Sequence, residues 1–338
     1  MEEIVVRVAT EALEAHGMPG ARIEDARVGA MRYAGMTIWK LRAVTTDGRP
    51  YLVSVNYPDE RVDIDTKLAP IGSHMLWLDS LARDTDLAVQ APTRNGEGDF
   101  VTRVDGTGEH AATACTVVDW IKGGDLPDAG DDLPPPDVAE RMGRLLARLH
   151  LHAAVWDIPA GFERSRHDMT RIRHSFSRLR PMVEAGQLSP ADYDLLMEAG
   201  NRIADMASAL GESRAVWGIT HGDFHNDNCV IHDGDVRPID FDFCYLGHYM
   251  RDVGYCFSLM TIHDDARDTQ FRSAFWRGYA DTRAVSEPER DALEAYFIEV
   301  GVDFWSERPS DDDAPRELST LAGEACRALL GGRRVLSV

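Results

Sequence analysis

Residues 219–252 read ITHGDFHNDNCVIHDGDVRPIDFDFCYLGHYMRD, and the order of polar residues in this stretch decides how the chain is interpreted. Asp223 follows a His-Gly pair, Asn228 comes five residues later, and Asp240 follows after another twelve. One acid and one amide therefore share a short loop, and a second acid lies farther along the chain.

A hairpin is predicted between the amide and the second acid. Cys229 to Ile231 is a short apolar run typical of a strand, and Asp233-Gly234-Asp235 is a turn signal. Val236 to Phe241 predicts a second strand, in which Pro238 indicates an edge or an irregular strand. The hairpin should bring Asn228 and Asp240 to the same end, next to the loop that carries Asp223.

Two acids and an amide placed together in this way are suited to binding a magnesium-bound polyphosphate. Mg2+ prefers hard oxygen ligands and usually takes one or two from the protein, while phosphate and water supply the rest. Asn228 and Asp240 can supply those two, which leaves Asp223 to accept or orient the proton of an attacking hydroxyl. A single Asp or Asn in a turn usually only caps the backbone, but here order, spacing and strand context agree.

The segment resembles the catalytic loop and metal loop of the aminoglycoside phosphotransferase and choline kinase family, which has the protein-kinase-like fold. The family pattern is His-x-Asp-x-x-x-x-Asn, then Ile-Asp-Phe or Ile-Asp-Trp, then Gly and Asp. The matching residues are His221, Asp223, Asn228, Asp240, Gly247 and Asp252.

The resemblance implies a role for each of these positions. It makes Asp223 the catalytic aspartate, Asn228 and Asp240 the metal ligands, and Asp252 a buttress of the loop, with His221 as structural support. His221 and His225 also form an H-x-x-x-H pair, which can indicate zinc. That alternative lacks the glutamate general base that such zinc motifs carry.

Bulk composition limits the class of protein. The chain has 338 residues, 44% of them hydrophobic and 28% charged, as in ordinary globular proteins. A net charge of −21 argues against binding a phosphate backbone, so no nucleic-acid partner is expected. No apolar run is long enough to span a membrane. The five scattered cysteines and the acidic start predict a cytoplasmic protein with no disulfide framework.

The N-terminal part is predicted to be rich in strands. An amphipathic helix ending at Gly17 precedes strands at 23–32, 36–43 and 51–57, and 45–48 is a hairpin turn. A helix over 70–84 should begin at Pro70, and strands at 100–104 and 112–120 follow. The expected fold class is α+β, a two-lobe protein-kinase-like fold with a nucleotide-binding lobe at 1–118 and a hinge at 119–124, which includes Trp120.

Helices dominate the expected catalytic and acceptor-binding lobe at 125–338. One helix should open at 134–136 and run to about 154, and further helices are predicted at 171–179 and 190–210. Residues 306–315 are expected to form an acidic loop.

The N-terminal lobe departs from the family at the phosphate-gripping ion pair. The family usually carries a Lys or Arg on the third strand and a Glu on the next helix. The alignment places Ser54 and His74 at these two positions. Three explanations stay open: Lys40 or Arg42 on the neighbouring strand supplies the cation, the chain is a pseudokinase, or the alignment has slipped.

Two weaker nucleotide-binding candidates lie in the same lobe. The turn around Gly35 takes the place of the phosphate-cradling loop, although a single glycine in a hairpin is more typical of an ordinary turn. Trp120 in the hinge is the second candidate.

Candidates for the acceptor site come from charge patterning. His167, Arg171, His174 and Arg178 form a basic stripe on one face of a predicted helix, which could bind an anion or could simply be a solvated face. Asp242, which follows the metal aspartate closely, is the best-placed acid for a cationic acceptor.

Together these features predict a phosphotransferase that moves the γ-phosphoryl group of ATP or GTP, with Mg2+, to a hydroxyl. The acceptor stays open among an aminoglycoside or other antibiotic, an amino alcohol such as choline, homoserine, a sugar and a protein serine or threonine. A pseudokinase and a nucleotidyl transferase are the alternatives, and the oligomeric state stays open.

Overall fold

The structure is a computed structural model that describes residues 2–33, 35–106, 111–127 and 133–336. The chain divides into two compact units, one formed by 1–122 with 157–164 and the other by 123–156 with 165–338. The division falls between Lys122 and Gly123, inside the stretch expected as the hinge. Segment 157–164 belongs to the first unit, and the N–H of Glu163 donates to Ser73 Oγ there at 2.8 Å.

The first unit is built on a five-stranded antiparallel sheet in the order β1-β2-β3-β5-β4. Its elements are α1 (Glu2–Ala15), β1 (Arg22–Tyr33), β2 (Met36–Val44), β3 (Pro50–Pro58), α2 (Leu68–Asp84), β4 (Val101–Val104) and β5 (Thr113–Asp119). The predicted strands are confirmed to within two residues. Helix α2 begins two residues before Pro70, at a position where the proline still removes only an unpaired N–H.

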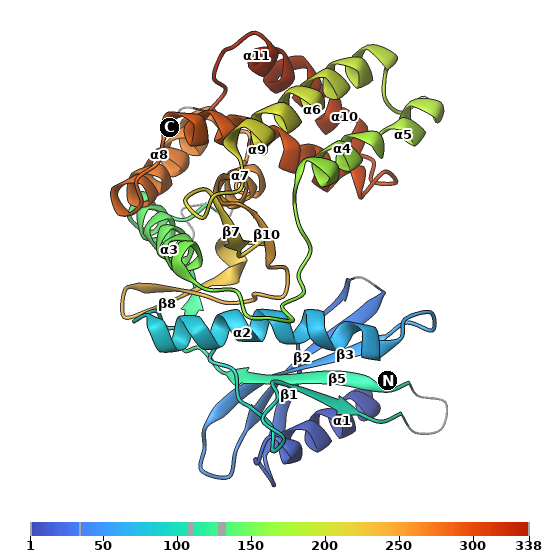
Figure 1. Cartoon of the computed structure of the whole chain (residues 1–338), viewed down its shortest axis with the longest axis vertical. Helices are drawn as coiled ribbons and strands as arrows, with labels where there is room; N and C mark the ends of the chain where they lie inside the picture. Colours follow the sequence, from blue (N-terminus) through green and yellow to red (C-terminus); the bar gives the residue numbers. More distant parts are fainter. Residues whose placement is uncertain (1, 34, 107–110, 128–132, 337–338) are drawn as a thin grey trace. The chain divides into compact units, whose positions relative to one another are not determined.

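Helices α1 and α2 lie on opposite faces of this sheet (Figure 1). Apolar side chains point to both faces of the sheet, so each face packs against its own helix. Leu41, Val53 and Val55 pack with Val8 and Leu13 of α1 in one apolar cluster. On the other face, Ala114 packs with Ile71 of α2. A strand points successive side chains to opposite faces, so Lys40 and Ser54 face away from α1.

The second unit is mainly helical. Its helices are α3 (Pro136–Val155), α4 (Met169–Ser177), α5 (Arg180–Glu184), α6 (Pro190–Leu210), α7 (Tyr249–Leu259), α8 (Asp265–Thr282), α9 (Glu287–Ser306), α10 (Ala314–Leu321) and α11 (Arg327–Leu330). Helices α3 and α8 approach closely through small residues. A Cβ at Gly143 would lie 2.0 Å from the carbonyl oxygen of Phe275, and one at Gly278 would lie 1.9 Å from that of Glu140.

Short strands in this unit hold residues 219–252. They are β6 (Gly124–Asp125), β7 (Trp217–Thr220), β8 (Cys229–His232), β9 (Asp235–Pro238) and β10 (Tyr245–His248). Strand β8 lies between β6 and β9, so β9 is an edge strand, as Pro238 predicts. The second strand ends at Pro238 rather than at Phe241 because Asp240 has a φ of +63°, which no strand residue adopts.

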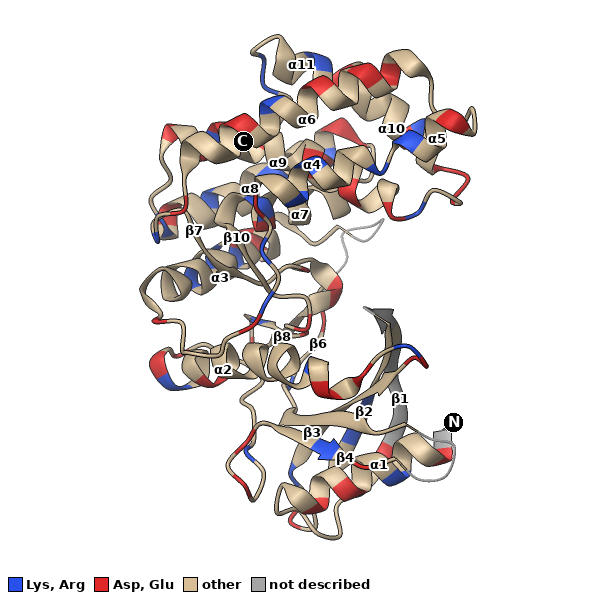
Figure 2. Ribbon diagram, turned by 45° about the vertical axis from the view of Figure 1, so that its right-hand side comes forward, with Lys and Arg blue, Asp and Glu red and all other residues tan. Residues whose placement is uncertain are grey.

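Charges are interspersed in this structure. In the view of Figure 2, both acidic and basic residues are spread over the helices of the second unit. Among the described residues, no helix combines the length and the apolar run needed to cross a bilayer.

Candidate active site

The loop after β7 carries Asp223 and Asn228, and their side chains are joined by a hydrogen bond. Nδ2 of Asn228 donates to Oδ2 of Asp223 at 2.8 Å and to its backbone carbonyl at 2.8 Å. Both amide hydrogens are used in this way. In the described part of the chain, Oδ1 of Asn228 accepts no hydrogen bond. It is thus an oxygen donor available to a cation, as the predicted magnesium site requires.

The hairpin β8–β9 returns the chain to this loop, as its turn signal predicts. The N–H of Ile239 donates to the carbonyl oxygen of Asn228 at 3.0 Å. Asp240 follows immediately in a left-handed conformation, which residues other than glycine seldom adopt. Asn228 and Asp240 are therefore neighbours, and their two oxygen donors fit the ligand set that Mg2+ takes from a protein.

Asp252 at the start of α7 holds the main chain of the loop. Its Oδ2 accepts the N–H of His221 at 2.7 Å, and its Oδ1 accepts that of Gly222 at 2.8 Å. Gly222 has a φ of +84°, and a Cβ there would lie 2.2 Å from the carbonyl oxygen of Phe243. The glycine in the His-Gly-Asp motif is thus required by conformation and by space.

His221 is fully buried and ties the two loops together. Its Nε2 donates to the carbonyl oxygen of Ile239 at 3.0 Å, and its Nδ1 accepts the N–H of Asp223 at 3.4 Å. Burial lowers the pKa of His221, so the ring is neutral. Both ring nitrogens are occupied, which leaves neither for the zinc considered for the H-x-x-x-H pair.

Two further side chains contact the Asp223 carboxylate. The hydroxyl of Tyr255 on α7 donates to Oδ1 at 2.6 Å, and Nε2 of His225 lies 3.7 Å from the same oxygen. Burial alone would raise the pKa of Asp223, but the contacts with His225 and Tyr255 outweigh burial and lower it. Burial lowers the pKa of His225, and the pairing with Asp223 raises it further than burial lowers it.

His150 and Tyr255 also belong to the site, although neither is predicted from the sequence. His150 of α3 is fully buried, and its Nε2 donates to Oδ2 of Asp252 at 3.2 Å while its Nδ1 accepts from Tyr279 at 2.7 Å. Tyr255 follows Asp252 by three residues, which is the spacing that shares a helix face, so it could have been found. No pattern in the sequence connects His150 to the loop.

A pocket of about 420 Å3 lies beside the loop. Its lining includes Asp125, Pro134, Asn226 and Asp227. The two carboxylates make the pocket acidic.

The basic stripe is largely neutralised by α9. Arg178 donates to Oδ1 of Asp303 at 2.7 Å and to Glu307 at 3.0 Å, and Arg171 lies 3.2 Å from Glu307. His174 is exposed on the same helix. Acids of the same unit thus already pair with the arginines that were candidates for an anionic group of the acceptor.

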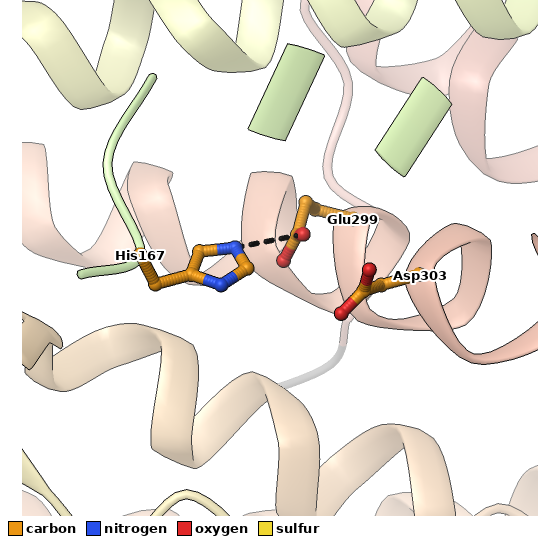
Figure 3. Close-up of side chains that lie close together, drawn as sticks. All are labelled: His167, Glu299 and Asp303. Atoms are coloured by element: carbon orange, nitrogen blue, oxygen red, sulfur yellow. Dashed lines mark hydrogen bonds and ion pairs between the residues drawn. The ribbon is translucent and has the colours of Figure 1, made fainter. Parts of the chain in front are cut away.

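A largely buried cluster between α9 and the residues just before α4 resembles a metal site in composition. The side chains of His167, Glu299 and Asp303 point toward one another, and Nε2 of His167 lies 2.9 Å from Oε1 of Glu299 (Figure 3). Arg251 of α7 neutralises the carboxylates, at 2.8 Å from Glu299 and 3.0 Å from Asp303. Burial would raise the pKa of Glu299, but Arg251 and His167 lower it to about 2. We interpret the cluster as an ion-pair core.

The first unit carries the nucleotide-binding candidates. Lys40 lies directly opposite Ser54 in the β2–β3 ladder. Arg42 pairs with Glu24 at 2.9 Å, and its guanidinium lies 5.2 Å from the centre of the Trp120 ring. Gly35 lies in the β1–β2 turn with a φ of +77°. His74 is buried on α2.

The chain is similar in sequence to known phosphotransferases. A model of the phosphotransferase enzyme family matches residues 42–296. A homoserine kinase of Methylobacillus glycogenes is 27% identical over 203 residues, which cover 58% of this chain and 57% of that protein. The match therefore spans little more than half of the relative's length.

Solved structures show the same fold at low identity. A microcompartment-associated aminopropanol kinase superposes with a TM-score of 0.69 at 17% identity, covering 97% of this chain and 98% of the other. An amicoumacin kinase in complex with AMP-PNP, Ca2+ and Ami superposes with a TM-score of 0.67 at 14% identity, covering 94% of this chain and 92% of the other. The predicted protein-kinase-like α+β fold is thereby confirmed.

Proposed function

The chain belongs to the phosphotransferase enzyme family, and we propose that it transfers the γ-phosphoryl group of ATP or GTP to a hydroxyl group of a small molecule, with Mg2+. The observation that carries this proposal is the joined pair of Asp223 and Asn228, held by Asp252. A phosphoryl transfer needs little covalent chemistry from the protein, and positioning and charge neutralisation supply most of its catalysis.

In the proposed reaction, the acceptor oxygen attacks the γ-phosphorus while the bond from that phosphorus to the β–γ bridging oxygen breaks. Asp223 orients the attacking hydroxyl and takes its proton. Its lowered pKa keeps it ionised at neutral pH. Oδ1 of Asn228 and the carboxylate of Asp240 would hold the Mg2+, which neutralises charge on the phosphates when bound.

For the acceptor we favour an alcohol that also carries an amine. The homoserine kinase and the aminopropanol kinase bear names that imply such acceptors. The acidic pocket beside the loop, with Asp125 and Asp227, and the net charge of −21 suit a cationic group. Asp242 is a further candidate for binding the amine. An antibiotic or a sugar remains the alternative acceptor.

For the N-terminal lobe we propose that Lys40 supplies the cation missing at Ser54. Lys40 lies directly opposite Ser54 and on the same face of the sheet, so an ammonium group from β2 starts close to the position of the absent one. Arg42, which pairs with Glu24 at 2.9 Å, is the other candidate on this strand, and its Cα lies opposite Leu52 rather than Ser54. The alternative function, a pseudokinase, rests on Ser54 and His74 at the positions of the usual ion pair.

The test is an acceptor screen that measures ADP or GDP release with L-homoserine, amino alcohols, aminoglycosides and sugars. We expect turnover with an amino alcohol or amino-acid hydroxyl, loss of turnover in Lys40→Ala and near-normal turnover in Arg42→Ala. Nucleotide binding without turnover on any acceptor would favour the pseudokinase. Normal turnover in Lys40→Ala would refute the role of Lys40, and a product mass would reveal nucleotidyl transfer.

A further inference from the structure

Helix α7 contacts three consecutive residues of the catalytic loop. Asp252 accepts the main-chain N–H groups of His221 and Gly222, at 2.7 and 2.8 Å. One helical turn later, Tyr255 donates to the side chain of Asp223 at 2.6 Å. Residues three apart lie on one face of a helix, so a single rigid surface fixes both the backbone of the loop and its carboxylate.

The Asp223 carboxylate is thereby held on both oxygens. Tyr255 occupies a lone pair of Oδ1 and Asn228 occupies one of Oδ2. A carboxylate has about four lone-pair sites, so sites remain for the hydrogen of an incoming hydroxyl. With a donor on each oxygen, the carboxylate cannot rotate without breaking a charge-assisted hydrogen bond.

The tyrosine acts here as a donor. Burial and the neighbouring negative charge of Asp223 both raise the pKa of Tyr255, so its hydroxyl keeps its proton. Tyr255 belongs to α7, which Arg251 joins to α9 through ion pairs with Glu299 and Asp303. The orientation of Asp223 is thus set by a helix that is itself fixed by buried ion pairs.

We propose that Tyr255 is a positioning residue for phosphoryl transfer, which fixes the Asp223 carboxylate in the orientation that receives the acceptor hydroxyl. The inference rests on the proposed function. It adds that transfer depends on a phenol hydroxyl outside the loop motif.

The test is Tyr255→Phe, which removes the hydroxyl and keeps the ring. A misoriented reacting group costs on the order of 100-fold in rate, so we expect kcat to fall roughly 10- to 100-fold with KM for the acceptor and Kd for Mg-nucleotide changed less than about threefold. Tyr296→Phe is the matched control, because its hydroxyl also makes a buried 2.6 Å hydrogen bond, to Nδ1 of His248. Its turnover should equal that of the wild type.

A double-mutant cycle separates positioning from general support of the fold. In the Asp223→Asn background, Tyr255→Phe should cause no further loss, since residues that act as a unit are not additive. An active wild type with unchanged kcat in Tyr255→Phe would overturn the Tyr255 proposal alone. The proposal would also be overturned if Tyr255→Phe weakened nucleotide binding and stability along with kcat. The same holds if Tyr255→Phe lowered kcat by the same factor in the Asp223→Asn background as in the wild type. A wild type that transfers phosphate to no acceptor would overturn the proposed function and this inference together.

Discussion

The second unit contains two clusters of similar composition, His167 with Glu299 and Asp303 and His225 with Asp223, which differ in how the charge of their carboxylates is balanced. At Glu299 and Asp303, arginines lie within 3.0 Å of each carboxylate. In the described residues, Asp223 has no ion-pair partner within 4.0 Å other than His225, and its remaining contacts are neutral donors. The first cluster has its charge balanced by the fold, whereas the second keeps a negative charge that a cation or a reacting proton can use.

The comparison shows what a charge pattern in a sequence can predict. Both clusters contain histidine and acids, yet the position of the arginines decides which one is structural. Helix α7 contributes to both clusters, because Arg251 belongs to the balanced cluster and the next residue, Asp252, holds the main chain of the loop that carries Asp223. A change at Asp223 should act on the chemistry directly, whereas a change in the balanced cluster should act first on stability.

The largest effect is expected from Asp223→Asn. The amide cannot take the proton of the acceptor, and general-base catalysis contributes roughly 10²- to 10⁴-fold, so kcat should fall by about that factor. The measurement is ADP release with the acceptor found by screening. Thermal unfolding should change little. The matched change in the balanced cluster, Asp303→Asn, should lower the unfolding temperature and retain turnover. The reverse result would contradict the distinction between the clusters.

The next largest effect is expected from Arg251→Met. Removing one partner of a buried ion pair costs about 3–5 kcal/mol, and here it would leave Glu299 fully buried without its cation. Urea unfolding should show that loss. The double variant Arg251→Met/Glu299→Met should regain much of it, because two apolar side chains leave no buried charge. A single variant as stable as the wild type would show that the cluster does not hold α7 to α9.

The smallest effect concerns two histidines, one from each cluster. Burial lowers the pKa of His167, whereas pairing with Asp223 raises that of His225. The contribution of His167 to stability is complete above its unfolded pKa of about 6.5 and declines below it. That of His225 is complete below about 6.5 and is lost as pH rises through its folded pKa.

Histidine NMR titrations in EDTA, assigned with His167→Gln and His225→Gln, measure both values. We expect the two pKa values to lie on opposite sides of about 6.5. Two values on the same side would remove this difference between the clusters.

The structural features that depend on local sequence patterns were predicted correctly. The β8–β9 hairpin follows from its Asp-Gly turn, and the strands of the first unit follow from alternation and hairpin signals. The family motif identified Asp223, Asn228 and Asp240 as candidates. The end of β9 was predicted three residues late, because the left-handed conformation of Asp240 is set by the loop around it and not by its own preference.

Contacts between residues that are far apart in the sequence could not be predicted from it. Strands β7 and β10 are four residues each and pair across a long separation, so neither gives a periodic signal. The pairing of Arg178 with Asp303 joins helices that are far apart in the sequence, and therefore the basic stripe looked available for an anion. The link from His150 to Asp252 is hidden for the same reason.

The central claim is that the loop of Asp223, with Asn228 and Asp240, forms a magnesium-nucleotide site. Calorimetric titration of the 338-residue protein with ATP and then GTP, with Mg2+ or with EDTA, tests it most directly, with Asp240→Ala as the paired variant. We predict binding that Mg2+ strengthens about tenfold or more in the wild type, and no such gain in Asp240→Ala. No binding of either nucleotide, or equal strengthening by Mg2+ in both proteins, would contradict the account.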